Sequence, residues 1–113
     1  MKDDRLYLIH IMECIERVIM YTEEGKDFFF VDIKTQDAVM RNLQILAEST
    51  QRLSDFLKEK HPEVDWRNIS GFRNVAVHEY LKIDVVGIWE IVEQDIPLLK
   101  EQIQKIMSEI DRS

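Results

Sequence analysis

The residues best suited to chemistry lie close together, between positions 71 and 80. This stretch reads Gly-Phe-Arg-Asn-Val-Ala-Val-His-Glu-Tyr and contains Arg73, Asn74, His78 and Tyr80. A histidine gains and loses a proton near neutral pH, which suits it to general acid or base catalysis. An arginine stays charged and presents a fork of N–H donors that can hold a phosphate or a carboxylate. The stretch is therefore the first candidate for a reactive site.

Helical spacing places these side chains on different sides of one predicted helix. Four apolar residues share a face, which we expect to be the core face: Ile69, Phe72, Ala76 and Ile83. His78 then points roughly away from the core, with Asn74 one turn before it, and Arg73 lies about 140° around the helix from His78. Such an arginine and histidine cannot easily share one substrate, whereas two chains meeting across a dimer axis could bring both to one cleft.

A solvated helix surface is the alternative interpretation of the same polar residues. By pattern alone it is the commoner case, since most exposed polar side chains have no chemical role. Val77 and Leu81 flank His78 and favour the edge of an interface instead. Elsewhere, His10 and Cys14 have the spacing of a helical metal pair, but a lone histidine and a core cysteine are the commoner explanation. We therefore expect no metal site.

The first half of the chain predicts two long helices joined by a short one. Asp3 or Asp4 can cap a helix that ends near Glu24 and Gly25. Its expected core stripe comprises Leu6, Ile9, Met12, Ile15, Ile19 and Thr22. The run Phe-Phe-Phe-Val at 28–31 should form a brief helix or turn that packs its rings inward. The next helix, about 34–59, should bury Val39, Leu43, Leu46, Thr50, Leu53 and Leu57. In this helix we expect a partly buried Glu48 to pair with Arg41 or Arg73.

The second half predicts two further helices and completes the fold class. His61, expected in a loop, precedes Pro62, which should end the long helix. Asp65 can cap a helix of about 66–81, and Asp84 can cap a last helix of about 85–110. Pro97 should kink or split that last helix, because proline lacks the N–H donor and clashes with the preceding turn. The expectation is an all-α fold, a small up-and-down bundle of about four or five helices.

Composition limits the class of protein. The chain has 113 residues, 45% of them apolar, with three glycines, two prolines and one cysteine, which predicts a single domain over 1–113. The start lacks the pattern of a signal peptide and no stretch is apolar enough for a membrane span, so we expect a cytoplasmic protein without membrane contact. Net charge is −7, but residues 33–82 hold 8 basic and 7 acidic groups, so any phosphate contact should come from the middle of the chain.

Arg73-Asn74-Val75-Ala76-Val77-His78-Glu79-Tyr80 resembles the Arg-x-x-x-x-His-x-Tyr motif of the HepT-like branch of the HEPN ribonuclease toxins. The segments around it are similar to that family too, in order along almost the whole chain. They include Tyr-Thr at 21–22, Ala-Val-Met-Arg-Asn-Leu at 38–43, Ile-Ser-Gly-Phe at 69–72, Ile-Asp at 83–84 and Asp-Ile-Pro at 95–97. Within the motif we see no departure from the family pattern.

The resemblance implies an all-α HEPN domain that forms a homodimer with its motifs facing each other. It implies a metal-independent endoribonuclease without a cofactor, acting on RNA and not on DNA. Arg73 and His78 are then catalytic, and Asn74 supports them. The family also implies a toxin–antitoxin pair, in which an MntA-like nucleotidyltransferase antitoxin attaches AMP to Tyr80.

Two rival functions remain open at this level. A non-catalytic helical module that binds a nucleotide or a partner protein would keep the bundle but have no use for His78. A purely structural dimerisation bundle would predict that changes at Arg73 or His78 have no effect in the cell. A nucleotidyltransferase gene beside this one would favour the toxin.

Overall fold

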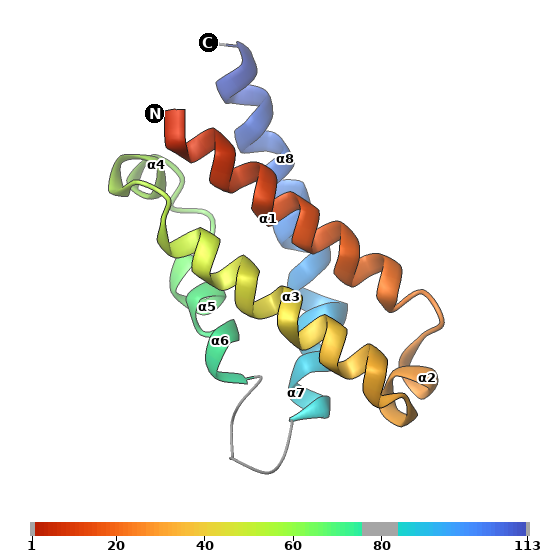
Figure 1. The fold of residues 1–113 in the computed structure, drawn as a ribbon. Coiled ribbons are helices and arrows are strands. Elements are labelled where there is room, and N and C mark those ends of the chain that lie inside the picture. Colours follow the sequence, from red (N-terminus) through yellow and green to blue (C-terminus); the bar gives the residue numbers. More distant parts are fainter. Residues whose placement is uncertain (1, 76–83, 113) are drawn as a thin grey trace.

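The structure, a computed structural model, describes residues 2–75 and 84–112, and every regular element within those ranges is a helix. The main helices run up and down along one long axis, with both ends of the chain at the same end of the bundle (Figure 1). An exposed ion pair between Arg5 and Asp111, 3.0 Å apart, joins the first and last helices there. The predicted all-α bundle is confirmed, although two of the predicted helices prove to be interrupted.

The two longest segments of the first half, α1 (Lys2–Tyr21) and α3 (Ile33–Gln51), lie side by side and form the centre of the bundle (Figure 1). The predicted short helix α2 (Lys26–Val31) connects them, but only part of its aromatic run packs inward: Phe29 is buried and Phe30 partly buried, whereas Phe28 is exposed. Gly25 precedes α2 with φ of 94°, a conformation that glycine adopts without the steric cost of a side chain. The chain can therefore reverse direction tightly between α1 and α2.

The buried stripe of α3 agrees with the prediction, and that of α1 agrees only in part. The predicted core residues Val39, Leu43 and Leu46 of α3 have no exposed surface. In α1 the predicted Leu6 is 49% exposed. The predicted Ile15 is fully buried and the predicted Met12 and Ile19 are partly buried, but the other buried apolar residues of α1 lie outside the predicted stripe: Leu8, Ile11, Cys14 and Val18. Because α1 carries apolar residues on several sides, periodicity alone could not identify the side that packs against its neighbours.

The helix predicted over 34–59 is interrupted, so that expectation was wrong. After α3 ends at Gln51, a separate helix α4 spans Asp55–Lys60. Ser54 caps α4: its hydroxyl accepts a hydrogen bond from the backbone N–H of Leu57 at 3.1 Å. The predicted core residues remain buried: Leu53 within the break and Leu57 in α4.

A buried carboxylate from the other end of the sequence fixes this break. Asp4 is only 3% exposed and accepts hydrogen bonds from the backbone N–H and the hydroxyl of Ser54, at 2.8 and 2.6 Å. Asp4 therefore holds the start of α4 rather than capping its own helix, which begins at Lys2. No local pattern announces this contact, since it joins residues 50 positions apart.

The helix predicted over 66–81 is also interrupted within the described residues. Asp65 caps α5 (Trp66–Ser70) as predicted, and its side chain accepts from the backbone N–H of Asn68 at 3.0 Å. Gly71 then separates α5 from α6 (Phe72–Val75). Glycine is a weak helix former, which accounts for a break at this position.

The last helical stretch is continuous but changes its winding. Asp84 caps α7 (Val85–Glu90) as predicted, its carboxylate accepting from the backbone N–H of Gly87 at 2.8 Å. A π-helical turn, η1 (Ile91–Asp95), leads directly into α8 (Ile96–Arg112). The wider turn immediately precedes Pro97, so the predicted kink takes the form of a π-turn instead of a break.

Both tryptophans pack against the core, and one of them bonds to the loop that holds His61. The rings of Phe29 and Trp89 lie 5.3 Å apart in the core. Trp66 is partly buried and donates from Nε1 to the carbonyl of His61 at 3.0 Å. His61 follows the end of α4 and lies in the loop before Pro62, as predicted, but it is buried, and its ring faces Glu63 at 3.2 Å and Glu109 of α8 at 3.5 Å.

Of the predictions for Cys14 and Glu48, the first is confirmed and the second is wrong. Cys14 is buried in the core, as predicted, and burial raises the pKa of its thiol while the charge of Arg17 partly opposes the shift. Glu48 is exposed, so the expectation of partial burial was wrong. Its predicted partner Arg73 donates instead to Gln51. Among the described helices, none has the length and apolar character needed to cross a membrane.

Candidate functional site

The short helix α6 holds the two described residues of the motif on the surface of the bundle. Phe72 is 2% exposed and Ile69, one turn before it, is also buried, which confirms these two residues of the predicted core face. Arg73 and Asn74 lie on the exposed side of α6. The Nη1 atom of Arg73 donates to Oε1 of Gln51 at 3.1 Å, at the end of α3. The buried ring of Phe72 therefore anchors a helix whose outer side presents a guanidinium group to solvent.

The other two motif residues, His78 and Tyr80, lie outside the described residues, as do Ala76, Val77, Leu81 and Ile83. The described chain stops at the end of α6 and resumes at the start of α7, and these two helix ends lie at the same end of the bundle (Figure 1). The structure thus places Arg73 and Asn74 together on α6. It does not test the predicted positions of His78 and Tyr80.

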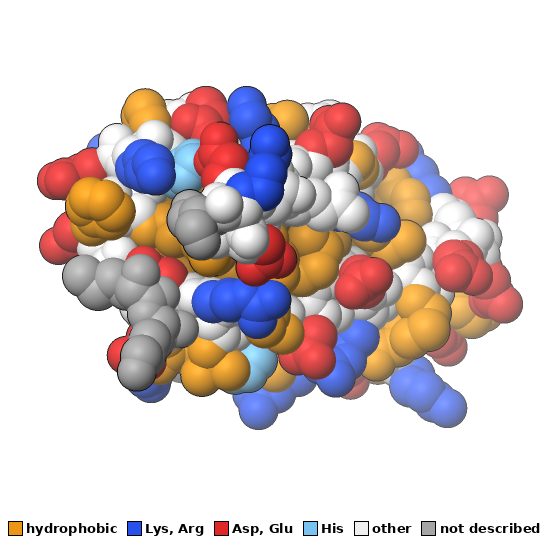
Figure 2. Space-filling view, turned by 90° about the horizontal axis from the view of Figure 1, so that it is seen from above, with side chains coloured by type: hydrophobic (Ala, Val, Ile, Leu, Met, Phe, Trp, Pro, Cys, Tyr) orange, Lys and Arg blue, Asp and Glu red, His pale blue; other side chains and the backbone are white. Residues whose placement is uncertain are grey.

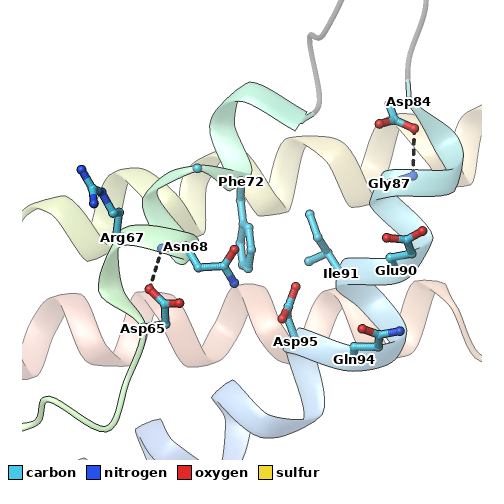
Figure 3. A pocket seen from close by; sticks show the side chains of 11 residues that line it. Asp65, Arg67, Asn68, Phe72, Asp84, Gly87, Glu90, Ile91, Gln94 and Asp95 are labelled. Atoms are coloured by element: carbon cyan, nitrogen blue, oxygen red, sulfur yellow. Dashed lines mark hydrogen bonds between the residues drawn. The ribbon is translucent and has the colours of Figure 1, made fainter.

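Beside α6 a cavity of about 560 Å³ opens between α5 and the stretch formed by α7 and the π-turn (Figure 3). From one side Asn68 and Phe72 line it, and from the other Ile91, Gln94 and Asp95 do so. In Figure 3 the side chains of Asn68 and Asp95 point toward each other across the opening, whereas Arg67 points away from it. Pockets of roughly 300–1,000 Å³ are typical of small-ligand sites.

Carboxylates dominate the charge of this cavity. Asp65, Asp84, Glu90 and Asp95 contribute acidic groups to its lining, against the single guanidinium of Arg67. Burial raises the pKa of Asp95, and the nearby charge of Asp65 raises it further, while hydrogen bonding from Asn68 opposes the shift. The cavity is therefore electronegative and offers mainly hydrogen-bond acceptors.

Two local features shape the cavity wall formed by α7 and the π-turn. At its upper end, Gly87 leaves room for the capping carboxylate of Asp84, because a Cβ at this glycine would lie 2.5 Å from Oδ2 of Asp84. At its lower end, the π-turn closes with a hydrogen bond from the N–H of Ile96 to the carbonyl of Ile91. This wider turn carries Ile91, Gln94 and Asp95, which all face the cavity.

The rest of the described surface offers less chemistry. The view along the axis from the end that holds the termini shows acidic and basic side chains interspersed with apolar ones, without an extended basic area on that face (Figure 2). Within residues 2–75 and 84–112, no cluster of three or more His, Cys, Asp or Glu side chains is arranged to hold a metal ion. His10 is exposed and its ring contacts Tyr7, at a centroid distance of 6.2 Å.

Comparison with known proteins identifies the family to which these features belong. Residues 11–106, which include α6 and all the residues that line the cavity, match the family described as "HepT-like: Ribonuclease HepT-like". The chain belongs to the HepT-like ribonuclease family. This membership confirms the resemblance found in the motif and the predicted enzyme class, a ribonuclease.

Curated relatives agree with this HepT-like assignment. "Probable ribonuclease HepT" of Thermococcus cleftensis is 38% identical over 101 residues, which cover 88% of this chain and 92% of that protein. "Putative RNase TTE0752" of Caldanaerobacter subterraneus subsp. tengcongensis is 38% identical over 111 residues, covering 95% and 96%. "Gamma-glutamylcyclotransferase and putative RNase MJ0434" of Methanocaldococcus jannaschii is 38% identical over 113 residues. This match covers 99% of the present chain, which spans about half, 51%, of that longer protein. No solved structure is significantly similar to the chain.

In this HepT-like chain, sequence reasoning found the motif arginine and missed the cavity. The sequence patterns do not single out Asn68 or Gln94. Asp95 entered only as part of an Asp-Ile-Pro match. A usable signal was present nonetheless, because polar residues at 93–95 interrupt an apolar run just before Pro97. A proline at that position predicts irregular winding in the preceding turn, and hence side chains that leave the helical register.

Proposed function

We propose that this chain is a metal-independent endoribonuclease whose catalytic residues are Arg73 and His78. The observation that carries the proposal is the setting of Arg73, exposed on a helix that the buried ring of Phe72 anchors. A guanidinium so held is accessible to a phosphate and is positioned by rigid structure, as a group that stabilises a transition state should be. Membership of the HepT-like ribonuclease family supports RNA as the substrate.

The proposed reaction needs a proton carrier and a fixed cation. His78 accepts the proton of the ribose 2′-hydroxyl as its oxygen attacks the neighbouring phosphorus. The bond between phosphorus and the 5′-oxygen breaks, and that oxygen receives a proton, which leaves a 2′,3′-cyclic phosphate and a 5′-hydroxyl. Arg73 donates to the phosphate oxygens, where negative charge accumulates, and Asn74 beside it supports this contact.

The same proposal extends to assembly and control. The chain forms a homodimer in which the motifs of both copies face one cleft, supplying Arg73 and His78 together. It acts as a toxin, and an MntA-like nucleotidyltransferase antitoxin silences it by adenylylating Tyr80. An AMP group there adds volume and negative charge beside Arg73, which then binds this phosphate in place of RNA. Mass spectrometry of Tyr80 after co-expression with the antitoxin tests this step, and light scattering tests the dimer.

A pair of arginine variants tests the catalytic proposal. Wild type, Arg73→Ala and Arg41→Ala are incubated with end-labelled RNA in the presence of EDTA. Arg41 is also exposed but lies on α3 outside the motif, so it controls for the loss of one positive charge. We expect Arg73→Ala to lose about 100-fold or more in cleavage rate, with an unchanged melting temperature, and Arg41→Ala to cut normally. The non-catalytic binding module predicts no cleavage by any of the three.

A further inference from the structure

We propose that the cavity beside α6 is a base-binding subsite that prefers guanine in the RNA substrate. The inference rests on the proposed ribonuclease function and adds to it the feature of RNA that this chain recognises. It concerns residues outside the Arg-x-x-x-x-His-x-Tyr motif, contributed by α5, α7 and the π-turn.

The location suits a subsite of the same enzyme. Gly71 and Phe72 line the cavity, and Arg73 is the next residue of α6. The guanidinium of Arg73 bonds Gln51 of α3 and does not itself line the cavity, so a strand whose phosphate Arg73 binds must pass over α6 for an adjoining base to enter the cavity. Sequence-specific binding of RNA commonly takes an unstacked base into a pocket that reads its Watson–Crick edge.

The shape of the cavity suits a flat ring with a polar edge. Phe72 and Ile91 supply apolar wall, and the amides of Asn68 and Gln94 stand beside the carboxylate of Asp95 (Figure 3). A second cavity of about 190 Å³ shares Asp65, Asn68, Phe72 and Asp95 with the first. The two cavities are therefore neighbours, and Asn68 and Asp95 line both of them.

The chemistry of the lining selects among the bases. A carboxylate such as Asp95 only accepts hydrogen bonds when ionised, so it favours a base edge rich in N–H groups. Guanine offers a ring N–H and an amino group side by side, which match the two oxygens of one carboxylate, and its carbonyl can accept from an amide N–H of Asn68 or Gln94. Uracil presents one N–H between two carbonyls, and these carbonyls would face the carboxylates.

Electrostatics argues that a base, and not a phosphate, enters this cavity. Four acidic groups against one arginine repel the RNA backbone from its interior. Arg67 points out of the opening and Arg73 lies on the outer side of α6, so the cations lie where the backbone would pass. The two arginines outside the cavity can therefore contact phosphates, while the acidic cavity receives the base.

The winding of the chain before Pro97 brings three side chains to the cavity. π-Helical turns are rare and occur frequently at functional sites, because they break the regular register of side chains. Here the π-turn Ile91–Asp95 contributes three lining residues, Ile91, Gln94 and Asp95. Glu93, in the same turn, is exposed and does not line the cavity.

The binding test uses GMP and UMP, which differ only in the base, and agmatine, a guanidinium compound without a base. NMR titrations of wild type, Asp95→Asn and the control Glu93→Gln would report affinity and the residues perturbed. We expect GMP to bind more tightly than UMP and to perturb Asn68 and Gln94. Asp95→Asn should weaken the binding of GMP by roughly tenfold, since it removes a charged acceptor, and should leave the binding of UMP unchanged. Glu93→Gln should behave as wild type.

Several results would overturn the inference. Equal affinities for GMP and UMP would do so, as would a GMP preference that survives in Asp95→Asn. Agmatine binding more tightly than GMP at the same residues would show that the cavity receives a basic side chain instead. These titrations need no cleavage, so they stand apart from the catalytic test. In the cleavage assay, RNA left intact by the wild-type protein would contradict the ribonuclease proposal. Cleavage by the wild type without preference for any base would contradict only the guanine subsite.

Discussion

The interface between α1 and α3 is filled by apolar side chains, whereas the space between α5 and the π-turn is lined mainly by polar ones. Ile11, Ile15 and Leu43 in the first region have no exposed surface. In the second, Asn68 and Gln94 are exposed and Asp95 is half-buried beside an open cavity. The comparison suggests that the first region provides stability and the second recognition. Substitutions in the two regions should therefore affect different measurements.

The largest effect on stability should come from the apolar interface. Leu43→Ala removes a fully buried side chain from α3, and we expect the free energy of unfolding to fall by about 2–5 kcal/mol. The matched change in the other region, Asn68→Ala, removes an exposed side chain and should cost less than about 1 kcal/mol. Urea unfolding followed by circular dichroism compares the two. Similar losses would contradict the division between the regions.

A buried polar contact should give the next largest effect. Asp4→Ala leaves the backbone N–H and hydroxyl of Ser54 without their acceptor, so we expect a loss of about 1–3 kcal/mol in unfolding free energy. Asp3→Ala is the control, because the carboxylate of Asp3, next to Asp4 in the chain, is exposed. In a double-mutant cycle, the effect of Asp4→Ala should shrink when Ser54 is already alanine. Additive effects would show that the contact does not hold the start of α4.

A smaller effect is expected where α7 begins, at the edge of the cavity. In Gly87→Ala the new methyl group would displace the carboxylate of Asp84, which now caps the helix. Loss of a cap costs about 0.5–2 kcal/mol, so the melting temperature should drop by a few degrees. Val86→Ala, an exposed position of the same helix, is the control. A Gly87→Ala protein as stable as wild type would mean that the cap contributes nothing there.

The smallest effect concerns the pH dependence of stability. The pKa of Asp95 is raised by burial and by the charge of Asp65, so folding favours its neutral form. Its contribution is then most favourable below the pKa of the unfolded chain and declines as pH rises through the folded pKa. Asp95→Asn should match wild type in acid and become slightly more stable as pH rises toward neutrality. Melting curves over that range test the sign, and a less stable variant at neutral pH would contradict it.

The sequence predicted the helices wherever the decisive contacts were local. Asp65 and Asp84 were recognised as N-caps because their partners lie three residues away. The break before α4 could not be predicted, since it depends on Asp4, fifty positions earlier. The buried face of α1 was misjudged in part for a related reason: the choice among several apolar sides depends on which helices pack against it. Local rules therefore gave the elements but not all of their interruptions.

The candidate site could likewise be predicted only in part. The motif and the face assignment of Phe72 came from spacing, and the described part of α6 agrees with them. The cavity could not be predicted, because it forms between α5 and a π-turn that are distant in sequence. Residue type and neighbours alone also gave a wrong environment for Glu48, which is exposed, since burial depends on which helices pack against each side of α3.

The most direct test of the central claim is expression of the wild-type chain and of His78→Ala in cells, followed by growth and by the integrity of total RNA. The ribonuclease account predicts that the wild type arrests growth and fragments RNA, while His78→Ala accumulates as a folded helical protein and does neither. Arg41→Ala, as the control, should remain as toxic as wild type. Fragmented RNA and arrested growth in cells that express folded His78→Ala would contradict the account, because the reaction would then not depend on this histidine.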